Sequence, residues 1–434
     1  MDRDGFAVLA AAQEFFDAGD SPGLAVSVLD SGKVLCSGAW GYAIPEKDVL
    51  VTEATLFGAG SISKQCLAAC ALIVLREQNR SLNDPLASYF APASVLNPSL
   101  TLRHLLSHTA GLGRHVDIQL ASDPLMRTEL LELVASLAKS SDAIEPGREW
   151  CYCNAGYALV GRILESLCEQ ELAEILRLRV LEPCRLEEYA LTLDDSQLRG
   201  AAVGHIPHDI GFRSVDRPSN SAAFGSGALL ISARDLARWG DRLWLQGALG
   251  FTVPSMMAEP QALADGTTLP YGLGVYLGEF AGGREYSHDG NSGGFSAQLA
   301  VYPSHGLSIA VVANSSRHSA EVLEQRIARL LHGVPEPAAI EADPAIAYAT
   351  PFAGTYRRQG EATTVIAVAG NLSITTPGGR KAKLIPLAFG RFVEEQDPTT
   401  EYLFSREKNR LLLEVRRFGK LLAILKGDGE RTDK

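Results

Sequence analysis

The chain has 434 residues, of which 46% are hydrophobic and 21% charged, so it has enough apolar sequence for large cores and predicts two or three domains. Its formal net charge of -11 argues against nucleic acid and anionic membrane surfaces as partners, and it favours neutral or cationic ligands. No stretch is long and apolar enough to span a bilayer, which argues against a helical membrane protein.

The start of the chain lacks the positively charged segment and the long apolar run of a signal peptide. We therefore expect a cytoplasmic protein, or a periplasmic one whose leader has been removed. The seven cysteines are an odd number without a framework spacing, which indicates reduced thiols. Cys151 and Cys153 have the spacing of a metal-binding pair, but no second ligand pair follows, so we expect buried thiols there.

The first predicted elements are an amphipathic helix over residues 6–18 and a β-hairpin whose strands are residues 24–29 and 34–40. From about residue 81 to residue 201 the pattern is helical with loops. The chain thus begins with sheet-forming sequence and continues into helical sequence.

Ser61 and Lys64 form a Ser-x-x-Lys motif just before the apolar run 66–75, which predicts a buried helix. At this spacing the two side chains share a helix face, about 5–6 Å apart at Cβ. Burial favours a neutral lysine, and a neutral amine beside a hydroxyl is a base beside a nucleophile. A serine at a helix start is more often only an N-cap. A second copy, Ser405-x-x-Lys408, lies between strand-like runs, so the tetrapeptide alone is a weak signal.

Residues 101–108 predict a short helix with Thr101 as its N-cap. His104 and His108 stand four residues apart in it, a spacing that can bind a metal ion. No adjacent glutamate and no third ligand is nearby, so we expect both histidines to make structural hydrogen bonds and expect no metal.

Tyr152 and Asn154 form the only Tyr-x-Asn in the chain, directly before a predicted apolar helix over residues 154–168. Tyr152 acts as a general base if nearby ammonium groups such as Lys64 keep its phenol anionic. Asn154 offers a donor and an acceptor that can hold a lysine and a substrate amide together. The alternative is a buried tyrosine hydroxyl followed by a helix N-cap.

His288, Asp289 and Gly290 form the only His-x-Gly, and we expect this motif just before a strand. A glycine there lets a substrate pair with the strand edge, and a strand N–H together with the N–H of Ser61 can form an oxyanion hole. The alternative is an ordinary glycine-rich turn. Residues 290–294 also fit the Gly-x-Ser-x-Gly nucleophile elbow, but a hairpin follows where that elbow needs a helix, so we reject it.

Strands near both ends of residues 1–333 enclose helices, which predicts an α+β fold with one antiparallel sheet, terminal helices on it and an inserted helical lobe. The cleft between sheet and lobe is the expected site. The later elements are a strand at 228–231, a helix at 234–245 capped by Ser232, a hairpin of 297–302 and 307–312, and a helix at 320–331.

The last part of the chain changes character. Residues 334–351 are rich in proline and predict a linker. Residues 352–434 alternate short strand-like runs with turns and need no helix, which indicates a small antiparallel β-barrel without a catalytic motif. The strand-like runs are 364–368, 372–375, 381–385, 402–404, 411–415 and 421–425.

The three motifs occur in the order of the penicillin-recognising serine hydrolases. The chain resembles the β-lactamase-like and penicillin-binding-protein-like members of that group, including class C β-lactamases, esterases and D-aminopeptidases. The resemblance covers about residues 24–314 and implies an α/β sandwich of β-lactamase-like fold. The tail resembles the lipocalin-like domain attached to some esterase and D-aminopeptidase relatives. The flanks that match are residues 57–65, 102–112, 154–157 and 271–274.

The resemblance implies a role for each motif residue. Ser61 attacks a carbonyl to give an acyl-enzyme, Lys64 and Tyr152 share the proton handling, and Asn154 positions Lys64 and the substrate. Water then hydrolyses the ester without a cofactor.

The third motif departs from the family pattern. His288 takes the place of the family lysine, and the N–H groups of Ser61 and Asn291 are implied to form the oxyanion hole. No Lys-x-Gly occurs in the chain, so a fixed cation for a β-lactam carboxylate is missing. Asp289 stands where the family has a small or hydroxyl residue, and with Gly290 and Asn291 we expect it to contact substrate. A carboxylate there favours an amine-bearing or neutral substrate.

We therefore expect a serine hydrolase that cleaves esters or small amides and peptides, including D-amino-acid substrates with a free amine. The expected partners are small molecules, and a homo-oligomer is compatible with the sequence. One alternative is a DD-peptidase or weak β-lactamase. Another is a non-catalytic, ligand-sensing protein of the penicillin-binding type, although such a protein needs no intact set of Ser61, Lys64 and Tyr152.

Overall fold

The computed structural model describes most of the chain. Its description leaves out residues 1–2, 20, 89, 92–95, 113–143, 192–197, 199, 209–210, 217–223, 316–318, 336–351, 359–360, 369–370, 378, 389–390, 395–396, 408–409, 418–419 and 428–434. The predicted linker lies almost wholly in the part left out, so the proposed boundaries of a domain 1–333 and a domain 352–434 stay predictions.

The centre of the hydrolase part is a seven-stranded sheet in the order β3-β2-β1-β12-β11-β10-β9. All the described pairings in it are antiparallel, and β1 meets β12 with Leu24 opposite Ala313. The two ends of this part of the chain therefore meet in the middle of one sheet. The strands are β1 (Gly23–Asp30), β2 (Lys33–Ile44), β3 (Val49–Leu50), β9 (Tyr276–Phe280), β10 (Gly283–Ser292), β11 (Phe295–Tyr302) and β12 (Leu307–Ala313).

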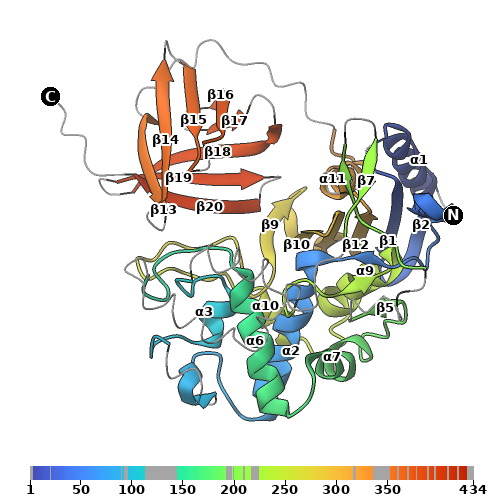
Figure 1. Cartoon of the computed structure of the whole chain (residues 1–434), viewed down its shortest axis with the longest axis horizontal. Coiled ribbons are helices and arrows are strands. Elements are labelled where there is room, and N and C mark those ends of the chain that lie inside the picture. Colours follow the sequence, from blue (N-terminus) through green and yellow to red (C-terminus); the bar gives the residue numbers. More distant parts are fainter. Residues whose placement is uncertain are drawn as a thin grey trace.

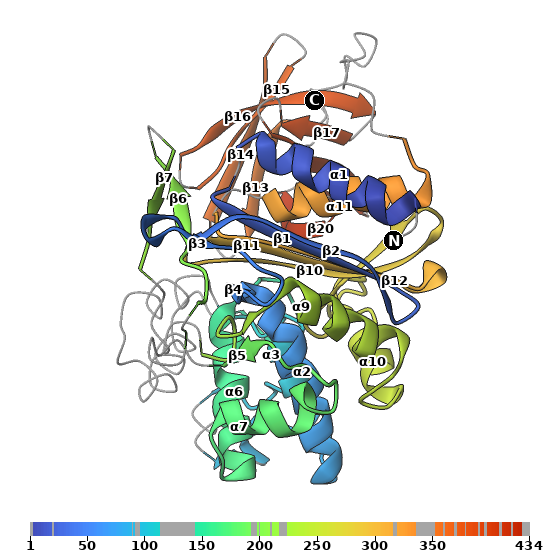
Figure 2. The same ribbon diagram turned by 90° about the vertical axis from the view of Figure 1, so that its right-hand side faces the viewer.

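Two terminal helices, α1 (Arg3–Asp17) and α11 (Ser319–His332), lie together on one face of the sheet (Figure 2). Their apolar faces pack on the strands through residues such as Val8 and Leu323, because an amphipathic helix buries its apolar stripe. The helical lobe lies on the opposite face (Figure 2). The predicted α+β architecture is confirmed.

The helical lobe is built around α2 (Ser63–Glu77), in which every residue from Ser63 to Leu75 is buried. The larger core lies between this helix, its neighbours and the sheet. The other described α-helices are α3 (Leu102–Leu106), α6 (Asn154–Cys168), α7 (Leu172–Leu176), α9 (Ala233–Gly240) and α10 (Thr252–Met257). Short π-helical turns follow α7 and α9 at η5 (Arg177–Leu181) and η7 (Asp241–Leu245). The 3-10 turns are η1 (Pro45–Lys47), η2 (Gly60–Ile62), η3 (Leu86–Ser88) and η8 (Pro303–His305).

Two small sheets connect the lobe to the large sheet. A three-stranded sheet joins β4 (Phe57–Gly58), β8 (Leu230–Ile231) and β5 (Tyr189–Ala190). Strand β4 delivers the chain directly into η2 and so positions Ser61. The hairpin of β6 (His205–Pro207) and β7 (Phe212–Ser214) was not anticipated from the sequence, because its strands have only three residues each.

The C-terminal part is a closed antiparallel barrel of β13 to β20, which confirms the predicted barrel (Figure 1). Aromatic and aliphatic side chains fill it, with Tyr356 and Leu413 fully buried. Two of its eight strands escaped the sequence analysis because one is largely polar and the other has four residues. The strands are β13 (Gly354–Arg358), β14 (Glu361–Val368), β15 (Asn371–Thr375), β16 (Lys381–Ala388), β17 (Arg391–Glu394), β18 (Asp397–Glu407), β19 (Arg410–Arg417) and β20 (Lys420–Gly427).

The barrel touches the hydrolase part through β20, which lies near β9 (Figure 1). Ile424 of β20 belongs to a buried cluster with Trp150 and Tyr271, and Lys426 Nζ lies 3.3 Å from Asp265 Oδ2. The barrel thus contributes a side chain to the interior of the other part. Among the described helices, none has the length and apolar character needed to cross a membrane.

Candidate active site

Ser61 lies in η2, one turn before α2 begins, and Lys64 lies in the first turn of α2. Lys64 is fully buried, and its Nζ donates hydrogen bonds to Ser61 Oγ at 2.9 Å and to the Ser226 carbonyl at 3.0 Å. Ser63 Oγ donates to the Gly60 carbonyl at 2.7 Å and accepts from the N–H of Leu229 at 3.2 Å. The second serine of the motif thus fixes the turn that presents the first, and the predicted Ser61–Lys64 pair is in contact.

Two glycines allow β10 to pass close to the turn that carries Ser61. A Cβ on Gly290 would lie 1.9 Å from the Ala59 carbonyl oxygen, and a Cβ on Gly60 would lie 3.0 Å from the backbone nitrogen of Asn291. Gly60 also has a φ of 50°, a region that favours glycine. This packing brings the Asn291 N–H beside the chain that leads into Ser61, as an oxyanion hole requires.

The surroundings of Tyr152 oppose the anionic phenol that a role as general base would require. Burial raises its pKa well above the ordinary value, the charge of Asp289 adds to this effect, and the Ser61 hydroxyl opposes it only weakly. Lys64 Nζ lies 4.9 Å from the centre of the Tyr152 ring, over its face. The Lys64 amine therefore packs against the face of the Tyr152 ring. Asn154 is the first residue of α6, as expected, and is half-buried.

His288 lies inside β10, opposite Leu299 of β11, and not before the strand as expected. The strand already begins at Gly283, because residues 283–287, which precede His288, pair with β9. His288 Nδ1 is 2.7 Å from the Asp289 carbonyl oxygen, and the Asp289 side chain is 28% exposed. The rejected nucleophile elbow is indeed in the hairpin of β10 and β11.

Two residues that the motifs did not identify join this site. Tyr271 Oη is 3.2 Å from His288 Nε2 and 3.3 Å from His108 Nε2. His108 Nδ1 accepts the backbone N–H of Cys153 at 3.1 Å. Burial, with smaller effects of Lys64 and His288, lowers the pKa of His108 well below its ordinary value, so its imidazole is neutral. Both residues lie in stretches that resemble the family, 102–112 for His108 and 271–274 for Tyr271, but the spacing of residues in the sequence could not show that the two side chains meet.

The remaining candidates for a metal site have structural surroundings. His104 closes a capping box with Thr101 at the start of α3, and burial lowers its pKa. Cys151 and Cys153 are buried, and none of the seven cysteines, all of which are described, forms a disulfide. Among the described residues, no three His, Cys, Asp or Glu side chains are arranged to hold a metal ion.

An aromatic wall continues the site toward the barrel. Trp150 and Tyr276 contact Tyr271, with ring centres 5.9 Å and 4.8 Å away. Tyr152 packs against this cluster, and Ile424 of the barrel belongs to it. The wall was missed because its members come from three separate stretches of the chain, 150–152, 263–276 and 424. Its position predicts apolar contacts for the part of a substrate that extends past Tyr152.

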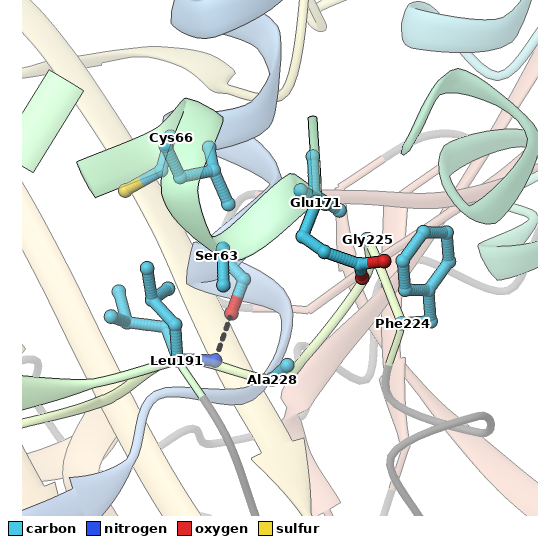
Figure 3. A pocket seen from close by; sticks show the side chains of 11 residues that line it. Ser63, Cys66, Glu171, Leu191, Phe224, Gly225 and Ala228 are labelled. Atoms are coloured by element: carbon cyan, nitrogen blue, oxygen red, sulfur yellow. Dashed lines mark hydrogen bonds between the residues drawn. The ribbon is translucent and has the colours of Figure 1, made fainter. Parts of the chain in front are cut away.

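A separate cavity of about 190 Å³ lies next to the start of α2 (Figure 3). Ser63 and Cys66 line one side, and Phe224 and Gly225 line another (Figure 3). None of the three motifs contributes its reactive side chain to this lining, so the cavity is distinct from the candidate active site. The sequence gave no signal for it.

Comparisons with known proteins agree with this geometry. The model of the β-lactamase family matches residues 8–333. The chain belongs to the β-lactamase family. The similarity expected from the three motifs is therefore confirmed at the level of the family.

The curated relatives carry two kinds of name. A D-aminopeptidase of Cereibacter sphaeroides is 27% identical over 311 residues, which are 69% of this chain and 58% of that protein. The chain therefore spans 58% of the length of this relative. Penicillin-binding protein 4 of Amycolatopsis lactamdurans is 28% identical over 381 residues, which are 81% of this chain and 98% of that protein.

Solved structures match the whole architecture, the barrel included. The crystal structure of SurE has a TM-score of 0.70 and 25% identity, and the match covers 98% of this chain and 99% of that one. A structure of SurE with D-Leu has a TM-score of 0.68 and 25% identity, with 97% of this chain covered. The β-lactamase-like fold with a C-terminal barrel is thus shared with SurE.

Proposed function

We propose that this protein is a serine hydrolase that forms an acyl-enzyme on Ser61 and cleaves esters or small amides. The contact of 2.9 Å between Lys64 Nζ and Ser61 Oγ carries the proposal, because it pairs a nucleophile with a base. Lys64 is held in place by the Ser226 carbonyl, so its amine stays directed at Ser61. Membership of the β-lactamase family supports the same chemistry.

In the proposed reaction, neutral Lys64 takes the Ser61 proton while Oγ bonds to the substrate carbonyl carbon. The carbonyl electron pair moves onto oxygen, which the N–H groups of Ser61 and Asn291 stabilise. When the tetrahedral intermediate collapses, the C–N or C–O bond breaks, and the leaving group takes the proton from Lys64 through the Tyr152 hydroxyl. Water then gives a proton to Lys64 by the same route and attacks the acyl carbon. The bond between this carbon and Oγ breaks, and Lys64 returns the proton to Ser61 Oγ.

The proposed substrates carry a free amine or no charge near the third motif. Asp289 is the charged side chain of that motif, and its carboxylate attracts an ammonium group. The name D-aminopeptidase in one set of relatives and the D-Leu in one SurE structure support D-amino-acid amides or esters as the first substrates to examine. The name penicillin-binding protein 4 in another relative keeps DD-peptidase or weak β-lactamase activity as the second candidate.

The test is hydrolysis of a small panel by purified wild type and Ser61→Ala: p-nitrophenyl esters, D- and L-amino-acid p-nitroanilides, and nitrocefin. Turnover of esters or D-anilides that is lost in Ser61→Ala supports the proposal, whereas turnover of nitrocefin alone supports the second candidate. Mass spectrometry after a fluorophosphonate probe locates the modified residue. A folded wild type that leaves Ser61 unmodified and turns over nothing overturns the proposal and favours a ligand-sensing role.

A further inference from the structure

The buried hydrogen bonds around Tyr271 have a definite direction. They run from the Cys153 N–H through His108, Tyr271 and His288 to the Asp289 carbonyl. We propose that Tyr271 is a positioning residue that holds His288 as the neutral imidazole with its proton on Nδ1. The third motif then presents no cation, although it stands where the family has a lysine.

The backbone fixes the direction of the hydrogen bonds between Cys153 and Tyr271. An N–H group only donates, so His108 Nδ1 must be the acceptor of the Cys153 N–H at 3.1 Å. The neutral His108 therefore carries its proton on Nε2 and donates it to Tyr271 Oη, 3.3 Å away. One lone pair of the Tyr271 hydroxyl is then occupied.

The Asp289 carbonyl fixes the direction of the hydrogen bonds between Tyr271 and Asp289. A carbonyl oxygen only accepts, so His288 Nδ1 must carry the proton that it shares with the Asp289 carbonyl at 2.7 Å. The remaining nitrogen, Nε2, is then an acceptor if His288 is neutral, and Tyr271 Oη lies 3.2 Å from it. Tyr271 keeps its proton, because burial raises its pKa well above the ordinary value. Every donor in the chain of bonds then meets an acceptor.

A cationic His288 would disturb this arrangement. Its Nε2–H would become a second donor to the Tyr271 hydroxyl, which already accepts the proton of His108. The Tyr271 proton would then have to turn from His288 to the hydroxyl of Tyr157, whose own proton goes to the Leu106 carbonyl. The side chain is only 1% exposed, and a buried charge is costly when its hydrogen bonds are not matched. The titratable groups near His288 in the described part of the chain are His108, Tyr152 from the segment before α6, Tyr276 from β9 and, on its own strand, Asp289, whose carboxylate is 3.9 Å from Nδ1.

A neutral His288 narrows the substrate class. A lysine at this position offers a permanent charge to a substrate carboxylate, whereas a neutral imidazole offers none. Substrates whose end near the third motif is an amide or ester, and not a free carboxylate, are then preferred. This consequence rests on the proposed hydrolase function, but the protonation state of His288 does not.

The experiment is an NMR measurement of ring nitrogens in full-length protein labelled with ¹⁵N-histidine. Two-bond ¹H–¹⁵N spectra distinguish bare from protonated nitrogens, and His288→Gln assigns the signals by their loss. We expect wild-type His288 to show Nδ1–H and bare Nε2 from pH 8 to pH 6. In Tyr271→Phe the ring loses its donor, and we expect both nitrogens to be protonated by pH 6, because Asp289 then favours the imidazolium.

Tyr302→Phe is the matched control. It removes an equally buried hydroxyl, which donates to Glu324 Oε1 at 2.8 Å in the other core of the molecule, and it should leave the His288 signals unchanged. A wild-type His288 with both nitrogens protonated at pH 7 overturns the proposal, and so does a folded Tyr271→Phe with the wild-type pattern. The wild-type spectrum alone decides the protonation state if the variant does not fold.

The activity measurement uses a pair of substrates that differ only in a terminal carboxylate or amide. For the wild type we expect the ratio of kcat/KM values for the carboxylate and the amide to stay constant from pH 8 to pH 6. For Tyr271→Phe the ratio should rise roughly tenfold over this range, the size of one charge-assisted hydrogen bond. A constant ratio in the variant, with His288 protonated in its spectrum, would overturn the link to substrate choice. Absence of any turnover would contradict the hydrolase function alone.

Discussion

Lys64 is the fully buried basic side chain that contacts Ser61 in the candidate site. It has no exposed surface, and its Nζ donates hydrogen bonds to the Ser61 hydroxyl and the Ser226 carbonyl. A lysine in such a place is costly for folding and is useful for chemistry, since a desolvated amine is readily neutral. Stability and activity should therefore respond in opposite directions when it is removed.

Lys64→Met tests this opposition. The side chains have similar length, so we expect the helix to keep its packing and the melting temperature to stay equal or rise, because a buried amine is removed. The rate of acylation should fall by about 10²–10⁴, the usual contribution of a general base. Rapid-quench measurement of acylation and a thermal melt provide the two readouts. A variant that is destabilised but fully active would show that Lys64 is only structural.

Asp289 is the second residue whose charge makes a prediction. Asp289→Asn keeps the shape of the side chain and removes the carboxylate. We expect kcat/KM for a D-amino-acid p-nitroanilide with a free amine to fall about tenfold, since a single charge-assisted contact is lost. The N-acetylated form of the same substrate serves as the control and should be unaffected. An equal effect on both substrates would refute recognition of the amine.

His108 predicts how stability depends on pH. Its pKa in the folded protein is depressed below the ordinary value of 6.5, so the unfolded chain takes up a proton that the folded chain refuses. The stabilisation is therefore complete above pH 6.5 and is lost as the pH falls, by about 1.4 kcal/mol per pH unit while only the unfolded state is protonated.

Urea unfolding of wild type and His108→Gln between pH 7.5 and pH 5.5 measures this effect. The loss of unfolding free energy with falling pH should be shallower in the variant than in the wild type. Parallel slopes in wild type and His108→Gln would show that His108 takes up its proton equally in the folded and unfolded protein, which contradicts the depressed pKa.

At the scale of elements, the site depends on β10 passing close to η2. Gly290 permits this because a Cβ would lie 1.9 Å from the Ala59 carbonyl oxygen, a contact that only a shift of the backbone can relieve. The strand carries His288 and Asn291 past Ser61, so any such shift would move the proposed oxyanion hole away from the proposed nucleophile. A displacement of about 1 Å is enough to lower rates by about 100-fold.

Gly290→Ala should therefore lower kcat by about 100-fold with a modest loss of stability, about 1–3 kcal/mol. Gly283→Ala is the control in the same strand, because a Cβ there meets the movable side chain of Ser304 at 2.7 Å and not a backbone. Steady-state kinetics and urea unfolding of both variants give the comparison. Wild-type kcat in Gly290→Ala would show that the strand does not set the site.

Local features were predictable from the sequence and long-range ones were not. The Thr101 cap, the buried helix after Lys64 and the terminal helices follow from spacing and polarity within a few residues. The contact of His108 with Tyr271 joins residues 163 positions apart, and no periodicity encodes it. The motif could not show whether the Tyr152 phenol becomes anionic, because burial, which raises its pKa, is revealed only by the fold.

At the scale of the whole molecule, the barrel completes a wall of the candidate site. Ile424 is 9% exposed and belongs to the cluster of Trp150 and Tyr276, and Lys426 pairs with Asp265 beside it. The sequence predicted the barrel, but it could not tell which of its strands packs against the hydrolase part. We expect a substrate that extends past Tyr152 to meet side chains from both parts of the chain.

Ile424→Ala measures the contribution of the barrel. The lost contacts should raise KM for esters with a large apolar leaving or acyl group by about 10-fold, and leave acetate esters nearly unchanged. Ile366→Ala, at a barrel position that is 47% exposed, is the matched control. Equal KM values for large and small esters in the Ile424 variant would show that the barrel is not part of the substrate site.

The pairing of β1 with β12 has a consequence for biosynthesis. Leu24 cannot find its partner until Ala313 has been made. At about 5–20 residues per second, the first strands wait on the order of tens of seconds, while the apolar sequence of α2 has no sheet to cover it. An unpaired strand edge beside an exposed apolar helix favours aggregation. The yield of folded protein in a cell should therefore depend on chaperones that hold the unfinished chain until the second half of the sheet leaves the ribosome.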